Sequence, residues 1–328
     1  MRAHFERYLT GQWYARRRSP LWLRALVPLY RAVSARRWRR PLERPPCPVI
    51  VVGNITVGGS GKTPVVAALA RLLARSGYAP AVISRGYGGR ATDQPRAVTA
   101  SSDPGQVGDE PVLLARRAGC AVWVCRDRRA ALQAACAGGA DVVLADDGLQ
   151  HPALPRSYEI CVVDGLRGFG NGLLLPAGPL RQPLDRLESI DSILVKNSGE
   201  RGEESESGGL PFAVVPGRPY RLGAQADGGL TVPRMEFDAV CAIGNPDSFF
   251  ALLEALGFRF RRRPFSDHHV FTSDELAQLR GPLIVTEKDA VKLERLDRAP
   301  ETWVLPIEAR LPEAVCEAVL EHVREFRP

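Results

Sequence analysis

The sequence predicts an α/β protein in which helices cover both faces of a mainly parallel sheet, with a second, smaller α/β lobe and a two-stranded linker. Two observations carry this prediction. Short apolar runs rich in valine and isoleucine alternate with helical stretches, which is typical of βαβ units. The alternation stops at a polar, glycine-rich segment and then resumes. A chain of 328 residues can form two such lobes without a disulfide or a metal to stabilise its core.

The first lobe is expected to start with a buried strand, because C-P-V-I-V-V is a continuous apolar run rich in β-branched residues. A glycine-rich loop separates this run from an apolar helix that Gly77 closes. The elements expected in this lobe are, in order, strand 47–52, helix 65–75, strand 81–84, helix 110–119, strand 121–124, helix 128–137 and strands 141–145, 159–164 and 192–196. This order predicts a mainly parallel sheet.

A polar stretch at 198–210 is expected to be an exposed loop. Two short extended pieces follow it, near 212–222 and 229–233, and are interpreted as a hairpin linker. The second lobe is expected from about Phe237, with helices at 247–257 and 274–280 and a loop near 264–271. The predicted organisation is a basic N-terminal segment at 1–45, a first lobe at 46–210, a linker at 211–235 and a second lobe at 236–328.

Composition excludes several classes of protein. With 45% hydrophobic and 25% charged residues, the chain is not globally disordered. Its seven cysteines form no C-x-x-C pair, so they indicate reduced thiols and neither a disulfide framework nor a zinc site. No run of eighteen apolar residues occurs, so no membrane-spanning helix is expected.

The positive charge is concentrated at the N-terminus. The net charge is +7, but residues 1–44 contain twelve arginines and only two acids, so the rest of the chain sums to −3. Aromatic and aliphatic residues lie between these arginines: Trp13, Trp22, Leu23, Leu26, Leu29, Tyr30, Val33 and Trp38. This pattern favours binding to an anionic lipid surface. A helix packed on the protein with solvated arginines, or a basic arm that binds nucleic acid, would give the same pattern.

The strongest motif is G-N-I-T-V-G-G-S-G-K-T, between strand 47–52 and helix 65–75. Its glycines allow backbone N–H groups to face phosphate oxygens, a lysine adds a positive charge and a threonine hydroxyl can coordinate magnesium. The expected nucleotide-binding residues are Gly58, Gly59, Ser60, Gly61, Lys62 and Thr63. Thr56 stands where the strict P-loop pattern has glycine. Because only four of the 44 basic residues are lysines, Lys62 is conspicuous, and the fold class is refined to a P-loop NTPase type.

Two acidic motifs are candidates for chemistry beside this loop. Asp146 and Asp147 end the strand in D-V-V-L-A-D-D-G, where a carboxylate can hold magnesium; an Asp-Asp-Gly turn with solvated acids is the alternative. In G-D-E-P, Asp109 is either a helix N-cap, with Pro111 inside the first turn, or a base that accepts the proton of an attacking hydroxyl.

In the second lobe, F-S-D-H-H-V-F precedes the capping-box pattern T-S-D-E at 272–275. Loop histidines are more often solvated than catalytic. Three of the five histidines, however, lie beside candidate aspartates: His151, His268 and His269.

These motifs together resemble the tetraacyldisaccharide 4'-kinase family, the lipid A kinases of Gram-negative bacteria. The motifs that carry the resemblance run through nearly the whole chain: V-G-N-I-T-V-G-G-S-G-K-T-P, S-R-G-Y-G-G, G-D-E-P, A-D-D-G-L-Q-H, G-N-G-L-L-L-P-A-G-P-L-R-Q-P, I-G-N-P, D-H-H and T-E-K-D-A-V-K. The departure from the strict P-loop pattern at Thr56 is itself a feature of this family. The resemblance implies transfer of the γ-phosphate of ATP, with Mg²⁺, to the 4'-hydroxyl of tetraacyldisaccharide 1-phosphate, which gives lipid IVA.

The resemblance also implies roles for individual residues. Lys62 and Thr63 would bind phosphate and magnesium, and Asp109 would be the catalytic base, paired with His268 from the second lobe. Further expected site residues are Asp146, Asp147 and Glu110 for the metal, and Arg85, Tyr87 and Arg181 for the substrate. Gln182 stands where the family often has glutamate. Lys288 and Asp289 are either a base-reading element similar to that of GTPases or a structural ion pair.

The expected partners are a membrane-embedded glycolipid substrate and the anionic surface of the inner membrane, with the protein peripheral on the cytoplasmic face. No nucleic acid and no obligate protein partner are expected. The competing interpretation of the residues is a nucleotide-dependent membrane switch. It fits the P-loop and the basic segment equally well, but it gives D-H-H and P-A-G-P-L-R-Q-P no role.

Overall fold

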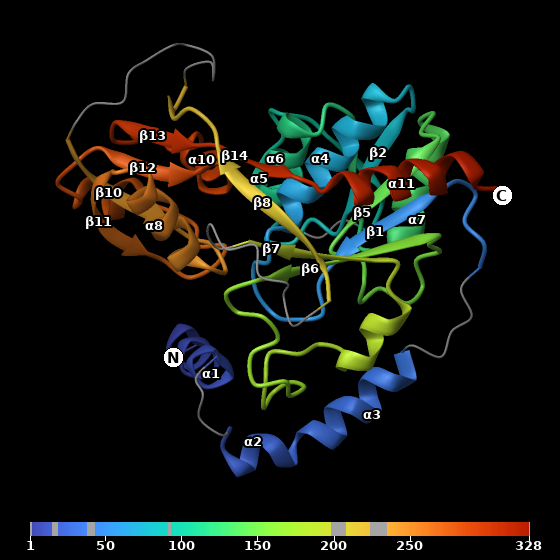
Figure 1. Cartoon of the computed structure of the whole chain (residues 1–328). Helices are drawn as coiled ribbons and strands as arrows, with labels where there is room; N and C mark the ends of the chain where they lie inside the picture. Colours follow the sequence, from blue (N-terminus) through green and yellow to red (C-terminus); the bar gives the residue numbers. More distant parts are fainter. Residues whose placement is uncertain are drawn as a thin grey trace.

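The structure, a computed structural model, describes residues 2–14, 19–37, 43–90, 93–197, 208–223 and 235–327. Within these ranges the chain forms two sheets flanked by helices (Figure 1). The larger sheet has nine strands in the order β14-β8-β7-β6-β1-β5-β2-β4-β3, and the smaller one has five in the order β11-β10-β12-β13-β9. The predicted α/β class, with a large parallel-dominated sheet and a second sheet, is confirmed.

The centre of the larger sheet is parallel, because each of its strands is followed by a crossover. Only the two edges are antiparallel, where β3 pairs with β4 and β14 pairs with β8. The strands are β1 Val49–Gly53, β2 Pro80–Ser84, β3 Arg96–Val98, β4 Ala121–Val124, β5 Val142–Asp146, β6 Tyr158–Asp164, β7 Ser192–Lys196, β8 Leu210–Pro216 and β14 Ile307–Arg310.

Two hydrophobic clusters cover the faces of this sheet. Alternate residues of β1 divide between them: Ile50 and Val52 pack with α4 and α6, whereas Val49 and Val51 pack with α7. Because both faces are covered, the central strands are apolar throughout, as the sequence predicts. The helices of this lobe are α4 Lys62–Arg75, α5 Pro104–Val107, α6 Asp109–Arg117, α7 Arg128–Ala137 and the 3-10 helix η1 Leu184–Ser189.

The smaller sheet has its own core, in which phenylalanines of β10 and α8 pack together. A capping box opens α9: the Thr272 side chain accepts from the Glu275 backbone N–H, and the Glu275 carboxylate accepts from that of Thr272, as the T-S-D-E pattern predicts. The elements of this lobe are β9 Tyr220–Arg221, β10 Glu236–Cys241, α8 Pro246–Ala255, β11 Arg259–Pro264, α9 Ser273–Ala277, β12 Leu283–Thr286, α10 Glu287–Leu293 and β13 Thr302–Leu305.

The connection between the lobes differs from a local hairpin. β8 leaves the larger sheet towards the smaller one, and β14 returns from it and pairs antiparallel with β8, with Ile307 opposite Pro216. The expected second piece, 229–233, lies outside the described residues. The chain end also differs from the predicted second lobe, because α11 Glu313–Glu325 packs its valines into the core of the larger sheet.

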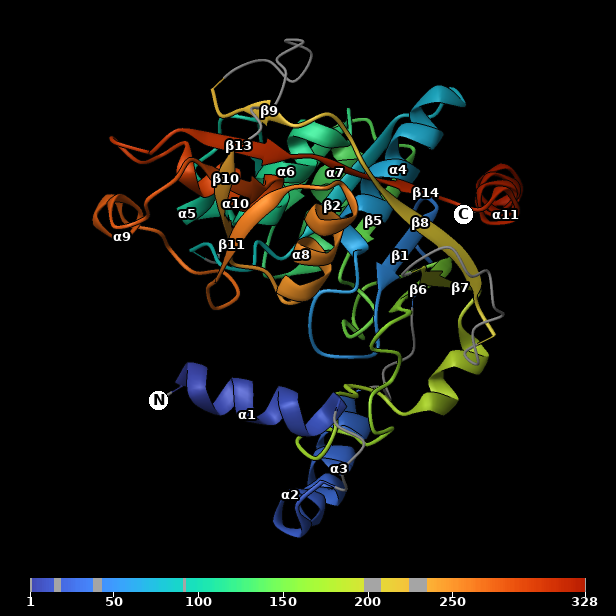
Figure 2. The ribbon, with the colours of Figure 1, turned by 60° about the vertical axis from the view of Figure 1, so that its left-hand side comes forward.

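Three helices precede the first strand: α1 Arg2–Tyr14, α2 Leu21–Ala25 and α3 Val27–Arg37. They lie together on one side of the body, as Figures 1 and 2 both show. Trp13 and Leu23 are buried, so these two residues pack on the protein, whereas Trp22, Leu26, Leu29 and Val33 are exposed. Trp38 lies outside the described residues. Among the residues described, no helix has the length and apolar character that crossing a membrane requires.

Candidate active site

The predicted site residues of the first lobe gather at the carboxyl edge of the larger sheet. β1 pairs with β5 on one side and β6 on the other, so Gly53, Asp146 and Asp164 end three neighbouring strands. In open parallel sheets, ligands bind in the crevice outside these strand ends. The phosphate loop follows β1 at this edge, and the two adjacent aspartates follow β5 beside it.

Lys62 begins α4, and its ammonium faces the aspartate pair. The distance from Lys62 Nζ to Asp147 Oδ1 is 3.4 Å, and Arg181 Nη1 lies 3.3 Å from Asp147 Oδ2. Desolvation works against ionisation of Asp147, but the charges of Lys62 and Arg181 outweigh it and hold its pKa at about 2. Asp147 is therefore an anion at neutral pH, held between two cations.

Asp146 has the opposite electrostatic environment. Its side chain is buried, and its Oδ1 has no hydrogen-bond partner among the described residues. Burial, and then the negative charges of Glu110 and Asp147, raise its pKa above the ordinary range. A cation would relieve this cost. No cluster of three or more His, Cys, Asp or Glu side chains able to hold a metal occurs in the described ranges, but Mg²⁺ bound with phosphates needs only one or two carboxylates, so Asp146 and Asp147 fit it.

Sequence reasoning missed Arg128, which lies behind these aspartates. The side chain is buried, and its Nη2 donates to the backbone carbonyl of Asp146 at 3.0 Å. Burial lowers the pKa of Arg128 to about 10, although Asp146 and Asp147 oppose the shift. The signal in the sequence was an arginine at the first position of α7, on the apolar side of the helix.

The loop at 170–183 packs directly on the phosphate loop. Arg181 N–H donates to the carbonyl of Ile55 at 2.7 Å, and Val57 N–H donates to that of Pro179 at 2.9 Å. The Arg181 guanidinium also donates to Gln150 Oε1 at 3.1 Å. Arg181, expected to contact substrate, is thus positioned by main-chain pairing next to Lys62.

Asp109 and His268, predicted as a pair, meet across the two lobes. His268 Nδ1 lies 3.1 and 3.2 Å from the two carboxylate oxygens of Asp109. Asp109 is the first residue of α6 and not its N-cap, which is Gly108. Tyr87 packs edge-on against the His268 ring, with centroids 4.8 Å apart. A side chain at Gly88 would place a Cβ 3.2 Å from His268 Nδ1, so glycine allows this close approach.

Cations of the second lobe surround Asp109. Burial would raise the pKa of this carboxyl, but the hydrogen bond with His268 and the charges of Lys288 and Lys292 lower it to about 2. Lys292 Nζ lies 3.5 Å from Asp109 Oδ2 and 2.9 Å from Asp289 Oδ1. Asp289 is fully buried and accepts the backbone N–H of Ala242 at 3.0 Å, which favours the structural interpretation of this residue.

Glu110 and Arg85, both predicted as site residues, interact with the rest of the site in different ways. Glu110 Oε1 forms an ion pair with Lys288 Nζ at 3.0 Å, and its charge acts on Asp146. Arg85 is exposed, and its charge acts on Arg128 and His151. His269 Nε2 lies 3.2 Å from Glu275 Oε2, within the second lobe. The sequence does not predict that Lys288 and Lys292 lie beside Asp109. The signal in the sequence is that lysine is rare in this chain, with only four among the 44 basic residues.

The second lobe also contacts the phosphate loop. A Cβ at Gly244 would lie 2.6 Å from the backbone nitrogen of Gly59, so only glycine allows this approach. Arg167 Nη1 donates to the Gly244 carbonyl at 3.0 Å, and the Asn245 amide donates to Asp164 Oδ2 at 3.0 Å. The loop is therefore covered by the turn before α8, and the cavity beside it measures about 10 Å³.

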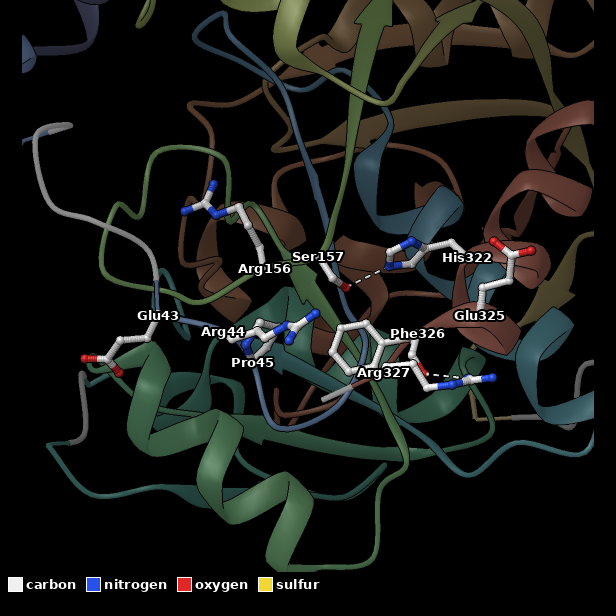
Figure 3. Close-up of a pocket in the computed structure, with 9 residues that line it drawn as sticks. All are labelled: Glu43, Arg44, Pro45, Arg156, Ser157, His322, Glu325, Phe326 and Arg327. Carbon is white, nitrogen blue, oxygen red and sulfur yellow. Dashed lines mark hydrogen bonds between the residues drawn. The ribbon is translucent and has the colours of Figure 1, made fainter.

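A larger cavity of about 540 Å³ lies elsewhere (Figure 3). Its lining includes Pro45 before β1, Ser157 before β6 and His322 of α11. Parallel strands place these residues at the amino edge of the sheet, opposite the phosphate loop. This cavity is not part of the candidate active site.

The fold and the carboxyl edge of the larger sheet define the class of protein: an enzyme of the P-loop type, with a lysine at the start of the helix after the loop and adjacent carboxylates at the neighbouring strand end. The second lobe adds a histidine that reaches an acid beside this edge, which a simple nucleotide switch does not require. Within this class, the chain belongs to the tetraacyldisaccharide-1-P 4'-kinase family, whose model matches residues 20–324. The chain is thus a kinase, and the family resemblance seen in the sequence is confirmed.

Individual relatives agree with this assignment. A tetraacyldisaccharide 4'-kinase of Alkalilimnicola ehrlichii is 49% identical over 93% of this chain and 94% of its own length. One from Dechloromonas aromatica is 46% identical over 97% and 98%. The crystal structure of LpxK from Aquifex aeolicus, an "apo" form in complex with ATP, matches with a TM-score of 0.70 and 25% identity, covering 91% of this chain and 98% of that one.

Proposed function

We propose that the chain transfers the γ-phosphate of ATP to the 4'-hydroxyl of tetraacyldisaccharide 1-phosphate, which gives lipid IVA. The substrates follow from the family and from the ATP complex of the Aquifex aeolicus relative. The observation that carries the proposal is the Asp109–His268 contact across the lobes at 3.1 Å, beside a P-loop. A nucleotide switch has no need of such a base.

In the proposed reaction, Asp109 orients the acceptor hydroxyl and takes its proton. The bond from the 4'-oxygen to the γ-phosphorus forms, the bond from that phosphorus to the β–γ bridging oxygen breaks, and ADP leaves. The transition state of phosphoryl transfer is loose, so the hydroxyl needs orientation and a final proton acceptor more than a strong base. An ionised carboxylate with a pKa of about 2 therefore suits this role.

Positively charged and N–H donor groups of the first lobe would neutralise the charge of the ATP phosphates. Lys62 and the backbone N–H groups of 58–61 bind the phosphates, and Arg181 stands beside Lys62 at the same aspartate. Thr63, Asp146 and Asp147 would hold Mg²⁺, which when bound neutralises part of the phosphate charge. Fixed donors of this kind stabilise charge that develops on the transferred group.

The two lobes act together. The first lobe, from 46, carries the nucleotide side, and the second lobe, from 236, supplies His268. Because Gly244 lies against Gly59, nucleotide entry requires the lobes to move apart, and their closure brings His268 back to Asp109.

The N-terminal helices bind the membrane on its cytoplasmic face. Exposed apolar side chains on α2 and α3 include Leu21, Trp22, Leu29 and Val33, and Leu21 is 79% exposed. The same segment contacts the loop that carries Arg181, because the Tyr30 hydroxyl donates to the Arg181 carbonyl at 3.0 Å. A glycolipid that stays in the bilayer would thereby meet the site without leaving the membrane.

The test is transfer of radiolabelled phosphate from ATP to tetraacyldisaccharide 1-phosphate in detergent micelles. We expect labelled lipid with the unchanged chain and a loss of about 10²–10⁴-fold in Asp109→Ala, the contribution of a positioned base. Thermal unfolding of Asp109→Ala is the control for folding. Steady ATP hydrolysis without lipid labelling would instead support the membrane-switch interpretation.

A further inference from the structure

Lys288 occupies an unusual position between the two lobes. It lies in the first turn of α10, and its side chain is only 13% exposed. Its Nζ is 3.0 Å from Glu110 Oε1, 3.2 Å from Asp267 Oδ1 and 3.3 Å from His268 Nε2. Glu110 belongs to the first lobe and the other two partners to the second. Because Lys288 is itself in the second lobe, only its contact with Glu110 requires the lobes to be together, and the contacts with Asp267 and His268 lie within the second lobe.

These contacts determine which groups donate and which accept. A lysine ammonium has three N–H donors and no acceptor. All three of its contacts must therefore be acceptors, and His268 Nε2 can accept only if it carries no proton. Asp267 Oδ1 also lies near Nε2, but at 3.7 Å it is too far away for a hydrogen bond.

The proton of a neutral His268 ring must then lie on Nδ1, which faces both oxygens of Asp109 at 3.1 and 3.2 Å. We propose that Lys288 is a positioning residue that fixes His268 in the tautomer protonated on Nδ1, so that the ring donates to Asp109 and the carboxylate stays the proton acceptor. This inference rests on the proposed function, because it assigns the base role within the Asp109–His268 pair.

The arrangement has a chemical consequence. With its Nε2 occupied by the lysine N–H, His268 offers no free lone pair to an acceptor hydroxyl. His268 orients Asp109 and does not itself take the proton. Its backbone is held in place separately, in a left-handed conformation with φ of 57°, and its N–H donates to Asp267 Oδ1 at 3.0 Å.

Lys292 provides a matched control on the same helix. It is one turn further on, carries the same charge and lies 3.5 Å from Asp109 Oδ2, with no contact to the His268 ring among the described residues. Removing Lys292 thus weakens the positive field at Asp109 but leaves the tautomer alone. Lys288→Met removes the contact with His268 Nε2 along with ion pairs to Glu110 and Asp267. Lys292→Met removes ion pairs to Asp109 and Asp289 and does not touch the His268 ring among the described residues.

The experiment combines nitrogen-15 NMR of the histidine side chains, without substrate, with steady-state turnover. His268 is assigned from the signal that disappears in His268→Gln. We expect the unchanged chain to have a proton on Nδ1 and none on Nε2. Lys288→Met should shift the ring towards the tautomer protonated on Nε2, and Lys292→Met should keep the proton on Nδ1.

Turnover is the second readout. In Lys288→Met, kcat should fall by about 10–100-fold, the effect of removing a partner that orients a functional histidine, while KM for ATP stays unchanged. Lys288→Arg, which restores a donor, should recover part of kcat.

A proton on Nε2 in the unchanged chain would overturn the proposal, even if Lys288→Met did not fold. So would a Lys288→Met protein with both the tautomer and kcat of the unchanged chain. These outcomes differ from a failure of the proposed function, in which the unchanged chain would transfer no phosphate to lipid while the tautomer could still be read.

Discussion

The two halves of the candidate active site differ in how the chain assembles them. The phosphate half lies within the first lobe and consists of short, continuous motifs, with Lys62 reaching Asp147 at 3.4 Å. The base half joins residues that are 159 positions apart, Asp109 and His268. Spacing along the sequence therefore identifies the first half directly, whereas the second half exists only when the two lobes meet.

The charges follow the same division. Asp147 is kept ionised by Lys62 and Arg181, both from its own lobe. Asp109 is kept ionised by a hydrogen bond from His268 and by the charges of Lys288 and Lys292, all from the other lobe. When the lobes separate, the pKa of Asp109 should rise and that of Asp147 should not. Under the proposed function, lobe closure would therefore prepare the proton acceptor but not the phosphate site.

Within the phosphate half, replacing Lys62 with alanine should have the largest effect, because it removes the cation at the start of α4 that follows the phosphate loop. We expect kcat for phosphate transfer to fall by about 10²–10³-fold, typical of losing one group that stabilises transition-state charge. Lys62→Arg should recover part of the activity, and thermal unfolding should show that both variants fold. Unchanged turnover in Lys62→Ala would mean that this loop does not bind the transferred phosphate.

The contact between the halves can be broken by Gly244→Val. Its Cβ would lie 2.6 Å from the Gly59 nitrogen, so the lobes could not close fully. We expect kcat to fall by up to about 10²-fold, the cost of misplacing reacting groups by about 1 Å. Gly11→Ala is the control, because a Cβ added at Gly11 would meet no other part of the protein within 4 Å beyond its own helix backbone. If Gly244→Val kept full kcat, closure at this contact would not be needed for the reaction.

The same division explains what could be predicted from the sequence. The central strands and the capping box of α9 follow from local pattern alone, and so does the placement of Lys62 beside Asp147 at one sheet edge. The sequence does not show that β14 and α11 return to the larger sheet, because pairing across about ninety residues leaves no periodic signal. Nor does it show that Lys288 contacts His268, since the direction of a side chain across a lobe interface depends on tertiary packing.

The exposed apolar side chains of the N-terminal segment should affect delivery of the lipid and neither half of the site. In the double variant Trp22→Glu, Leu29→Glu, two exposed apolar side chains are replaced by acids. Each apolar side chain is worth about 1.5–3 kcal/mol when buried, so we expect binding to vesicles of anionic phospholipid to weaken by tenfold or more. Vesicle co-sedimentation measures this effect. Leu256→Glu, an exposed leucine of the second lobe, is the control, and equal binding by both variants would exclude this segment as the membrane contact.

The smallest effect is expected at His322, which belongs to neither half. It lines the cavity at the amino edge of the larger sheet, and its Nε2 lies 2.8 Å from Ser157 Oγ (Figure 3). Burial lowers the pKa of His322 more than the charges of Asp191 and Glu325 raise it. The unfolded chain therefore takes up this proton more readily, so acidification through the ordinary histidine pKa of about 6.5 should lower the free energy of unfolding.

His322→Gln should make the free energy of unfolding depend less on pH between about pH 7 and pH 5, because one of the groups that titrate there is gone. Denaturant unfolding at several pH values measures this slope. His151, whose pKa burial lowers to about 4, stays in the variant and keeps part of the slope. Phosphate transfer at neutral pH should be unchanged, because no described contact joins this cavity to Asp109 or Lys62. A loss of turnover in His322→Gln would show that the amino edge of the sheet is coupled to the site at the opposite edge.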